Sequence, residues 1–285
     1  MYTAPFSYKK VTNLSEALSL LQQNPEAKLL AGGHSLIPAM KLRLAAPPML
    51  IDISKVAELR GIRRDGDTLV IGAMTTYREL ETSDLLKELC PIIPQAVSLI
   101  GDPMVRAKGT IGGSLAHADP AADLPATMLA LDAKIKIQGA GGARVVDIDH
   151  FFTGMFSTAV GPGEILAEVH IPIGGSAHAP APARRMAYAK FPHPASRYAV
   201  VGVAVVIGPS GLRAAVTGAG EHAMRLTKLE QALSGQALTA ESIAAACQGL
   251  LPADNLNHDL AASKEYRAHL VDVMAKRALM QAAGL

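Results

Sequence analysis

The N-terminal part of the chain carries short apolar runs around one helical pattern. Apolar side chains over residues 13–23 recur at the three- and four-residue spacing of a helix face. Asn13 stands where a helix cap is expected, Glu16 follows at capping-box spacing, and Pro25 ends the pattern. Apolar runs bounded by turn residues then predict three short strands, over residues 28–31, 49–53 and 68–74.

The middle of the chain mixes helical patterns with alternating ones. Residues 84–100 are predicted to be helical with interruptions at Pro91 and Pro94, and the Gly-rich stretch 109–113 is expected in a turn or at a strand edge. A short apolar helix is predicted over 124–131. Alternation of apolar and polar residues predicts three strands, the first two forming a hairpin, over residues 134–138, 143–148 and 164–171.

A change in composition divides the chain into two parts. Residues 174–182 are rich in Gly, Ala and Pro, and they mark the best domain boundary in the sequence. Two strands and three helices are predicted beyond it, over residues 198–207, 211–217, 226–233, 240–251 and 263–283. The pattern therefore predicts a mixed chain of two domains, 1–175 and 176–285.

Composition narrows the class of protein. The 285 residues are 49% hydrophobic and 18% charged with a net charge of +2, which is typical of a globular protein without a nucleic-acid-binding surface. No apolar run is long enough to span a bilayer and the first ten residues do not resemble a signal peptide, so we expect a cytoplasmic location. The two cysteines, Cys90 and Cys247, are too few for an iron–sulfur cluster and are predicted to be packed, reduced thiols.

The first candidate for chemistry is the segment 31–35, Ala-Gly-Gly-His-Ser, which follows a predicted strand. Glycines allow positive φ and leave no Cβ in the way, so successive backbone N–H groups can converge on an anion. The Ser35 hydroxyl adds a donor, and the whole shape suits a pyrophosphate. A Gly-Gly pair after a strand is nevertheless also found in ordinary turns. The segment matches neither the dinucleotide fingerprint of the Rossmann fold nor a Walker A loop.

A second glycine segment, Thr110-Ile111-Gly112-Gly113-Ser114, has the same character and continues into Ala-rich sequence that ends at Asp123. Asp123 precedes a predicted helix, so its carboxylate could cap that helix or accept hydrogen bonds from ribose hydroxyls. Two such loops can flank one extended diphosphate group, which a single loop could not enclose. The pair therefore indicates a dinucleotide bound through a fold other than the Rossmann fold.

These segments resemble a known family. AGGHS at 31–35 with LIPAMKLRL behind it, VRAKGTIGGSLAHADPAADLPA at 105–126 and the EYRAHL stretch within 263–270 are similar to the FAD-binding medium subunits of molybdenum hydroxylases, the xanthine dehydrogenase and aerobic carbon monoxide dehydrogenase family. The resemblance covers essentially the whole chain. It implies an α+β fold in which a FAD-binding domain of the vanillyl-alcohol-oxidase/p-cresol-methylhydroxylase type, with subdomains of about 1–57 and 58–175, precedes a C-terminal domain of antiparallel sheet and helices.

The resemblance also implies roles for individual residues. Backbone and hydroxyl groups of one loop are expected to hold the pyrophosphate from one side, and those of the other loop to hold it and the ribityl chain. These residues are Ala31, Gly32, Gly33, His34 and Ser35 in the first loop, and Thr110, Ile111, Gly112, Gly113 and Ser114 in the second. Asp123 matches a carboxylate that bonds the adenosine ribose, Leu166 an apolar flavin contact, and Lys190 a lysine near the isoalloxazine ring. A cation there would stabilise reduced flavin and raise its potential.

The family further implies non-covalent FAD, so His34 is expected to contribute a backbone contact rather than a covalent link. Two [2Fe–2S] clusters on a small subunit and molybdopterin on a large subunit are expected as partners, in a dimer of heterotrimers. We expect FAD here to relay electrons to an external acceptor, with no catalytic residue and no metal ligand in this chain. Two other readings stay open, a stand-alone flavin reductase resembling the enolpyruvyl reductases and an assembly subunit that has lost its flavin.

Overall fold

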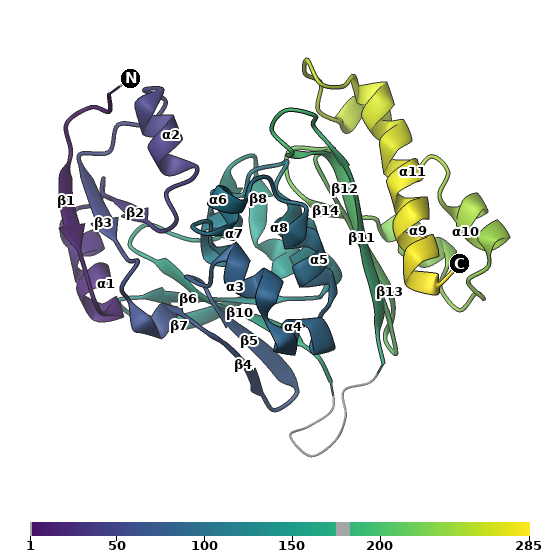
Figure 1. The fold of residues 1–285 in the computed structure, drawn as a ribbon, viewed down its shortest axis with the longest axis horizontal. Coiled ribbons are helices and arrows are strands. Elements are labelled where there is room, and N and C mark those ends of the chain that lie inside the picture. The colour runs from purple at the N-terminus through teal and green to yellow at the C-terminus, as the bar shows by residue number, and fades with distance from the viewer. Residues whose placement is uncertain (1, 175–182) are drawn as a thin grey trace.

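The computed structural model describes residues 2–174 and 183–285, so residues 175–182 of the expected boundary lie outside the described residues. The described chain forms a series of layers, with the N-terminal unit at one end and the C-terminal helices at the other (Figure 1). Runs of helices and runs of strands form separate stretches of the chain, and the two larger sheets are antiparallel, which confirms the α+β class. Among the described residues, no helix combines the length and hydrophobicity needed to cross a membrane.

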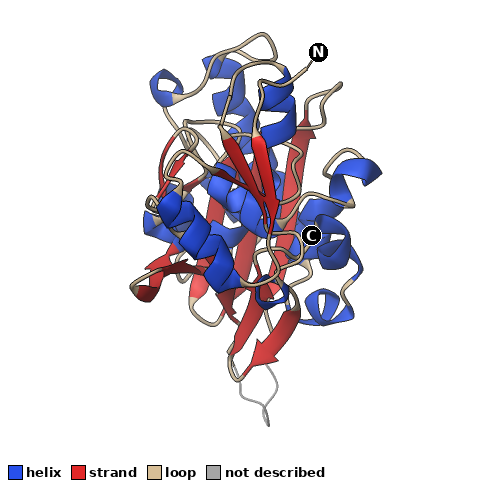
Figure 2. Ribbon diagram, turned by 90° about the vertical axis from the view of Figure 1, so that its left-hand side faces the viewer, coloured by secondary structure: helices blue, strands red, loops and turns tan. Residues whose placement is uncertain are grey.

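The N-terminal unit is a three-stranded parallel sheet in the order β1-β3-β2. It lies nearest the viewer in Figure 2. Asn13 caps its first helix by accepting a 2.8 Å hydrogen bond from the Glu16 N–H, as its position in the sequence predicted. The elements of this unit are β1 (Ser7–Lys10), α1 (Leu14–Gln23), β2 (Lys28–Leu30), α2 (Leu36–Lys41) and β3 (Met49–Asp52).

The central unit is a five-stranded antiparallel sheet, ordered β4-β5-β10-β6-β7, with helices packed on one face. Its strands are β4 (Ile62–Asp65), β5 (Thr68–Gly72), β6 (Lys134–Gly139), β7 (Gly142–Asp147) and β10 (Ile165–Pro172). Its helices are α3 (Tyr77–Thr82), α4 (Asp84–Leu89), α5 (Ile92–Ser98), α6 (Pro103–Arg106), α7 (Ile111–His117) and α8 (Asp123–Ala130), and a small pair, β8 (Phe152–Gly154) and β9 (Ser157–Thr158), lies beside them. The predicted hairpin over 134–148 is confirmed as β6 and β7.

Three local predictions need correction. Pro94 does not interrupt a helix, because it lies in the first turn of α5, where its missing N–H has no helical acceptor to bond. The Gly-rich stretch expected in a turn instead enters α7, with Thr110 as the cap. The helix predicted over 240–251 ends at Ala246, shortly before Gly249 takes a left-handed φ of +59°. A strand over Arg185–Pro192 was not predicted.

The C-terminal unit is a four-stranded antiparallel sheet, β11-β12-β13-β14. Its long helix α11 covers one face, while α5 and α8 of the central unit cover the other (Figure 1). Its elements are β11 (Arg185–Pro192), β12 (Ala199–Gly208), β13 (Gly211–Thr217), β14 (Met224–Arg225), α9 (Thr227–Ala232), α10 (Ala240–Ala246) and α11 (Lys264–Ala283). Because one face of this sheet completes the central hydrophobic core, the two units are packed as one body.

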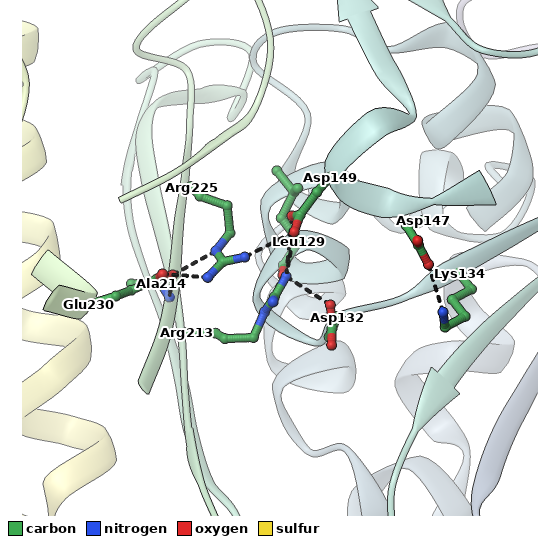
Figure 3. Close-up of polar contacts among 9 residues, drawn as sticks. All are labelled: Leu129, Asp132, Lys134, Asp147, Asp149, Arg213, Ala214, Arg225 and Glu230. Carbon is green, nitrogen blue, oxygen red and sulfur yellow. Dashed lines mark hydrogen bonds and ion pairs between the residues drawn. The ribbon is translucent and has the colours of Figure 1, made fainter. Parts of the chain in front are cut away.

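A polar network also joins the central unit to the C-terminal sheet (Figure 3). Arg213 of β13 donates to the Leu129 carbonyl at 3.1 Å and pairs with Asp132 at 3.0 Å and Asp149 at 3.2 Å. Arg225 of β14 reaches the same Asp149 at 3.1 Å. Two guanidinium groups therefore converge on one carboxylate at the edge of the interface. Their planar donors fix how the C-terminal sheet lies against the central unit.

The EYRAHL stretch has a structural explanation in Arg267 of α11. Its side chain is 4% exposed, and one terminal nitrogen donates to the carbonyls of Val200 and Gly218 at 2.6 and 2.7 Å. The other pairs with Asp259 at 2.7 Å. This guanidinium satisfies one carbonyl in β12 and one directly after β13 from the helix side, so the motif anchors α11 to the sheet.

A buried carboxylate on β10 organises the face of the central sheet opposite the helices. Glu168 has a 10% exposed side chain and bonds Arg63 of β4 at 2.8 Å, Lys136 of β6 at 3.0 Å and His170 at 2.9 Å. Burial opposes ionisation, but hydrogen bonds from His170, Arg63 and Lys136 outweigh it and lower the pKa of Glu168 to about 2. The ionised side chain therefore links three strands of the central sheet, β4, β10 and β6.

The Glu168→Gln variant is expected to lose less free energy of unfolding than the wild type as the pH is lowered. A depressed pKa gives stabilisation that is fully present above the pKa of an unfolded glutamate, about 4.3, and is lost as the pH falls towards about 2. Because the partners are partly exposed to solvent, we expect an effect of roughly 1 kcal/mol. Urea unfolding between about pH 7 and pH 3 measures it. Glu26→Gln, at an exposed position, is the control and should lose stability in parallel with the wild type.

Candidate cofactor-binding site

The two glycine segments lie side by side, although nearly eighty residues separate them. A Cβ placed on Gly32 would stand 2.2 Å from the Lys108 carbonyl oxygen, and one placed on Gly113 would stand 3.9 Å from the Ala31 Cβ. Gly32 is therefore required for the close approach of the two loops. The fold brings together the pair of loops that the sequence predicted would act together.

The first loop connects β2 to α2 and presents its backbone outward. Gly33 has a φ of +74°, in the left-handed region that favours glycine. The N–H groups of residues 32–35 donate no hydrogen bond to any residue within 2–174 or 183–285. His34 turns its ring back to the Gly32 carbonyl at 2.9 Å, and the Ser35 hydroxyl makes no cap bond to α2. This loop can therefore offer several backbone donors to one anion.

The second loop is built differently, because the protein already uses its backbone donors. The N–H of Ile111 bonds the Thr75 carbonyl at 3.0 Å, and that of Gly112 bonds the Ala73 carbonyl at 2.8 Å. Gly113 donates to the Thr110 hydroxyl at 3.1 Å, and the Ser114 N–H donates to the Thr110 carbonyl at 3.0 Å. The loop can thus offer a ligand the hydroxyl hydrogens of Thr110 and Ser114 and a surface without side chains, but not these four N–H groups.

Gly112 has a packing role that the sequence did not indicate. A Cβ there would stand 2.5 Å from the Ala73 Cβ and 2.8 Å from its carbonyl oxygen. The residue allows α7 to lie directly on the end of β5. Leu166 lies close to this contact, since the carbonyl of its neighbour Ala167 accepts from the Ala73 N–H at 2.9 Å. Leu166 itself is 6% exposed and packs in the central core.

A cavity of about 660 Å³ opens beside the loops. Residues 31–34 and Thr110 line it, together with three cationic side chains that sequence reasoning missed, those of Lys10, Arg60 and Lys108. Only Lys108 adjoins a motif in the sequence, directly before Gly109. Lys10 and Arg60 come from β1 and from the segment before β4, and no local pattern sets them apart. Their charges make the cavity suitable for a phosphate-bearing ligand.

Asp52 is the buried carboxylate of this cavity, and its oxygens are occupied. It accepts hydrogen bonds from the Tyr8 hydroxyl and from the Ser54 N–H, the latter at 2.8 Å, and lies 3.8 Å from Lys10. Burial opposes its ionisation, but the bonds from Tyr8 and Ser54 outweigh this and lower the pKa of Asp52. The carboxylate therefore holds the wall of the cavity in place.

Asp123 and Lys190 form a buried ion pair outside this cavity. Asp123 begins α8, but the cap position is Ala122, so the carboxylate does not cap the helix. Its Oδ2 lies 2.9 Å from the Lys190 Nζ, and the two side chains are 5% and 2% exposed. Burial raises the pKa of Asp123, while the charge of Lys190 acts in the opposite direction. The resemblance implied that Asp123 bonds the adenosine ribose and that Lys190 lies near the isoalloxazine ring, and the structure pairs these two side chains directly.

The comparisons with known proteins agree with this geometry. Residues 4–174 match the family described as the FAD binding domain in molybdopterin dehydrogenase, and residues 186–282 match the CO dehydrogenase flavoprotein C-terminal domain. The chain is 39% identical over 280 residues to the carbon monoxide dehydrogenase medium chain of Hydrogenophaga pseudoflava, covering 96% of both proteins. It is 35% identical to the 6-hydroxypseudooxynicotine dehydrogenase complex subunit alpha of Paenarthrobacter nicotinovorans, covering 97% of this chain and 94% of that subunit.

The fold comparison gives the same answer. The structure of carbon monoxide dehydrogenase from Hydrogenophaga pseudoflava, in a form lacking the Mo-pyranopterin moiety, matches with a TM-score of 0.92 over 100% of this chain and 99% of that chain, at 39% identity. The chain therefore belongs to the FAD-binding medium subunits of the molybdenum hydroxylase family, and so is a flavoprotein component of an oxidoreductase. Its cofactor is FAD, and the outward donors of the first loop and the cationic cavity fit a dinucleotide diphosphate.

Proposed function

We propose that this subunit takes electrons from the [2Fe–2S] clusters of a small subunit and passes them through FAD to an external acceptor. Substrate oxidation then takes place at a molybdenum cofactor on a large subunit, in a dimer of heterotrimers. The observation that carries the proposal is the first glycine loop, whose N–H groups at 32–35 bond no described residue and whose residues 31–34 line a cationic cavity. Within the described residues no cluster of three His, Cys, Asp or Glu side chains could hold a metal ion, so the metal centres are assigned to the partners.

Each part of the proposed FAD site has a task that follows from its contacts. The first loop, residues 31–35, holds the diphosphate with backbone donors, and hydroxyls of Thr110 and Ser114 hold it from the other side. Lys190 and Asp123 belong to one end of the ligand, and we assign them to the isoalloxazine end because the cation there favours reduced flavin. Leu166 supplies an apolar contact. FAD supplies the carrier chemistry when bound, and the chain binds and orients it without a catalytic residue.

We place the domain boundary at residues 175–176, with the FAD-binding domain divided near residue 57. In our proposal this subunit does not determine the substrate of the complex. The two relatives named above resemble this chain along most of its length, yet they belong to complexes with different substrates. Specificity then resides on the large subunit.

Electron transfer between purified subunits tests the proposal. The full chain is loaded with FAD and mixed anaerobically with the chemically reduced two-cluster small subunit encoded with it. We expect the flavin absorbance to bleach while the cluster spectrum returns to its oxidised form. The proposal fails if FAD binds but no bleaching follows. Oxidation of NADPH by the isolated chain in the presence of a nucleotide sugar would instead support a stand-alone reductase.

A further inference from the structure

Tyr188 of β11 is a buried titratable side chain with no role in the site described so far. It is 2% exposed, and its hydroxyl donates to the Asp123 Oδ1 at 2.5 Å. Its own N–H donates to the Gln95 side-chain oxygen of α5 at 3.0 Å. Across the sheet, a Cβ on Gly202 would stand 2.2 Å from the Tyr188 hydroxyl oxygen. A glycine in the middle of β12 thus makes room for the phenol to reach the carboxylate.

With the hydrogen bond from Tyr188, both oxygens of Asp123 in the buried ion pair have a partner. Asp123 uses one oxygen for Tyr188 and the other for Lys190, and the Lys190 Nζ also lies 3.3 Å from the Leu99 carbonyl. A buried carboxylate stays ionised only when charge and hydrogen bonds replace the lost water. Tyr188 and Lys190 both oppose the burial that raises the pKa of Asp123, Lys190 by its charge and a hydrogen bond and Tyr188 by a hydrogen bond.

The field of this pair reaches the second glycine loop. Tyr77 of α3 lies against Gly109, and burial raises the pKa of Tyr77 to about 12, with the charges of Asp123 and Asp119 adding to the rise. Tyr198, in the loop between β11 and β12, has its pKa raised by burial and by the same two carboxylates. The charged and titratable groups that act on one another around Asp123 are therefore Tyr188, Lys190, Tyr77, Tyr198 and Asp119.

We propose that Tyr188 is a positioning residue for the flavin reaction, because its hydrogen bond favours the ionised form of Asp123 that pairs with Lys190 and thereby sets the charge that Lys190 presents to FAD. The inference rests on the proposed function, in which the isoalloxazine ring lies at the Lys190 end of the site. Without the phenol hydroxyl, Asp123 takes up a proton as the pH falls, and the positive charge of Lys190 is left without its counter-charge. Flavin reduction then becomes more favourable, because the uncompensated cation stabilises the added electrons.

The test is the pH dependence of the flavin midpoint potential in the FAD-loaded full chain. Tyr188→Phe is expected to bind FAD and to have a potential that rises more steeply than the wild-type potential as the pH is lowered. In the Asp123→Asn background the same substitution should add no further pH dependence, because no carboxylate remains to be protonated. Tyr266→Phe, on the exposed face of α11, is the matched control and should behave as the wild type.

The outcomes separate this inference from the proposed function. A wild-type chain that binds no FAD contradicts the proposed function, whereas a flavin-loaded Tyr188→Phe with wild-type pH dependence overturns the role of Tyr188 alone. Should Tyr188→Phe fail to fold, 3-fluorotyrosine placed at position 188 keeps the ring and the hydroxyl. Its fluorine resonance should then shift when bound FAD is reduced with dithionite, and an unchanged resonance counts against the inference.

Discussion

Replacing Lys190 with Met is expected to lower the free energy of unfolding by about 3–5 kcal/mol, the usual cost of breaking a buried ion pair by removing one partner. The side chains of Lys190 and Asp123 are 2% and 5% exposed, so water cannot replace the lost partner. The substitution leaves a buried carboxylate with Tyr188 as its remaining side-chain donor. Urea unfolding of the apo chain at neutral pH measures the change.

Two comparisons show whether the unpaired charge is the cause. The double variant Lys190→Met/Asp123→Leu should recover much of the loss, because replacing both members of a buried pair with apolar groups is often neutral. Lys264→Met breaks an exposed pair between Lys264 and Asp254, whose side chains are 41% and 89% exposed, and should lower the free energy of unfolding far less than Lys190→Met does. A double variant as unstable as Lys190→Met would show that lost packing, not lost pairing, dominates.

Replacing Gly33 with Val is expected to weaken FAD binding at least about 100-fold while leaving the rest of the fold intact. A β-branched residue strongly disfavours the φ of +74° at this position, so the loop must change its path. Each charge-assisted bond lost from the diphosphate costs about 1.5–3 kcal/mol, and two such losses exceed the roughly 2.7 kcal/mol that corresponds to 100-fold. Fluorescence titration of the apo chain with FAD measures the affinity.

Gly66→Val is the matched control for this substitution. Gly66 has a similar φ of +61°, lies in the turn between β4 and β5, and has open space around the position of a Cβ. Both variants should lose comparable stability from backbone strain, but Gly66→Val should bind FAD as the wild type does. Equal loss of FAD affinity in the two variants would mean that strain alone, rather than the first loop, controls binding.

The difference between the two loops guides which substitutions are informative. Gly112 packs against Ala73, so a larger residue there disturbs the contact between α7 and β5 as well as any ligand. The backbone donors at 111–114 are already used within the protein, whereas those at 32–35 bond no described residue. Substitutions at Gly33 therefore report on FAD, whereas substitutions at Gly32 and Gly112 also report on the fold.

The sequence by itself determined the features that depend on neighbouring residues. Apolar spacing predicted α1 with its Asn13 cap, the β6–β7 hairpin and the long helix α11, because periodicity and capping act within a few residues. The two glycine loops were found by their composition, since φ near +74° and close backbone approach both call for residues without a side chain. The same motifs resemble those of the molybdenum hydroxylase medium subunits, and this resemblance predicted the family.

Only the tertiary structure decided which distant groups meet. It placed Lys10 and Arg60 around the cavity and Asp123 against Lys190, 67 residues away, and it turned the Gly109–Gly113 stretch into the start of α7. The strand β11 has no clean alternation, because one of its buried positions holds a lysine whose partner comes from another unit. Burial and pairing of charge depend on the assembled layers rather than on local sequence, and for this reason the pairing of Asp123 with Lys190 could not be predicted before the fold was known.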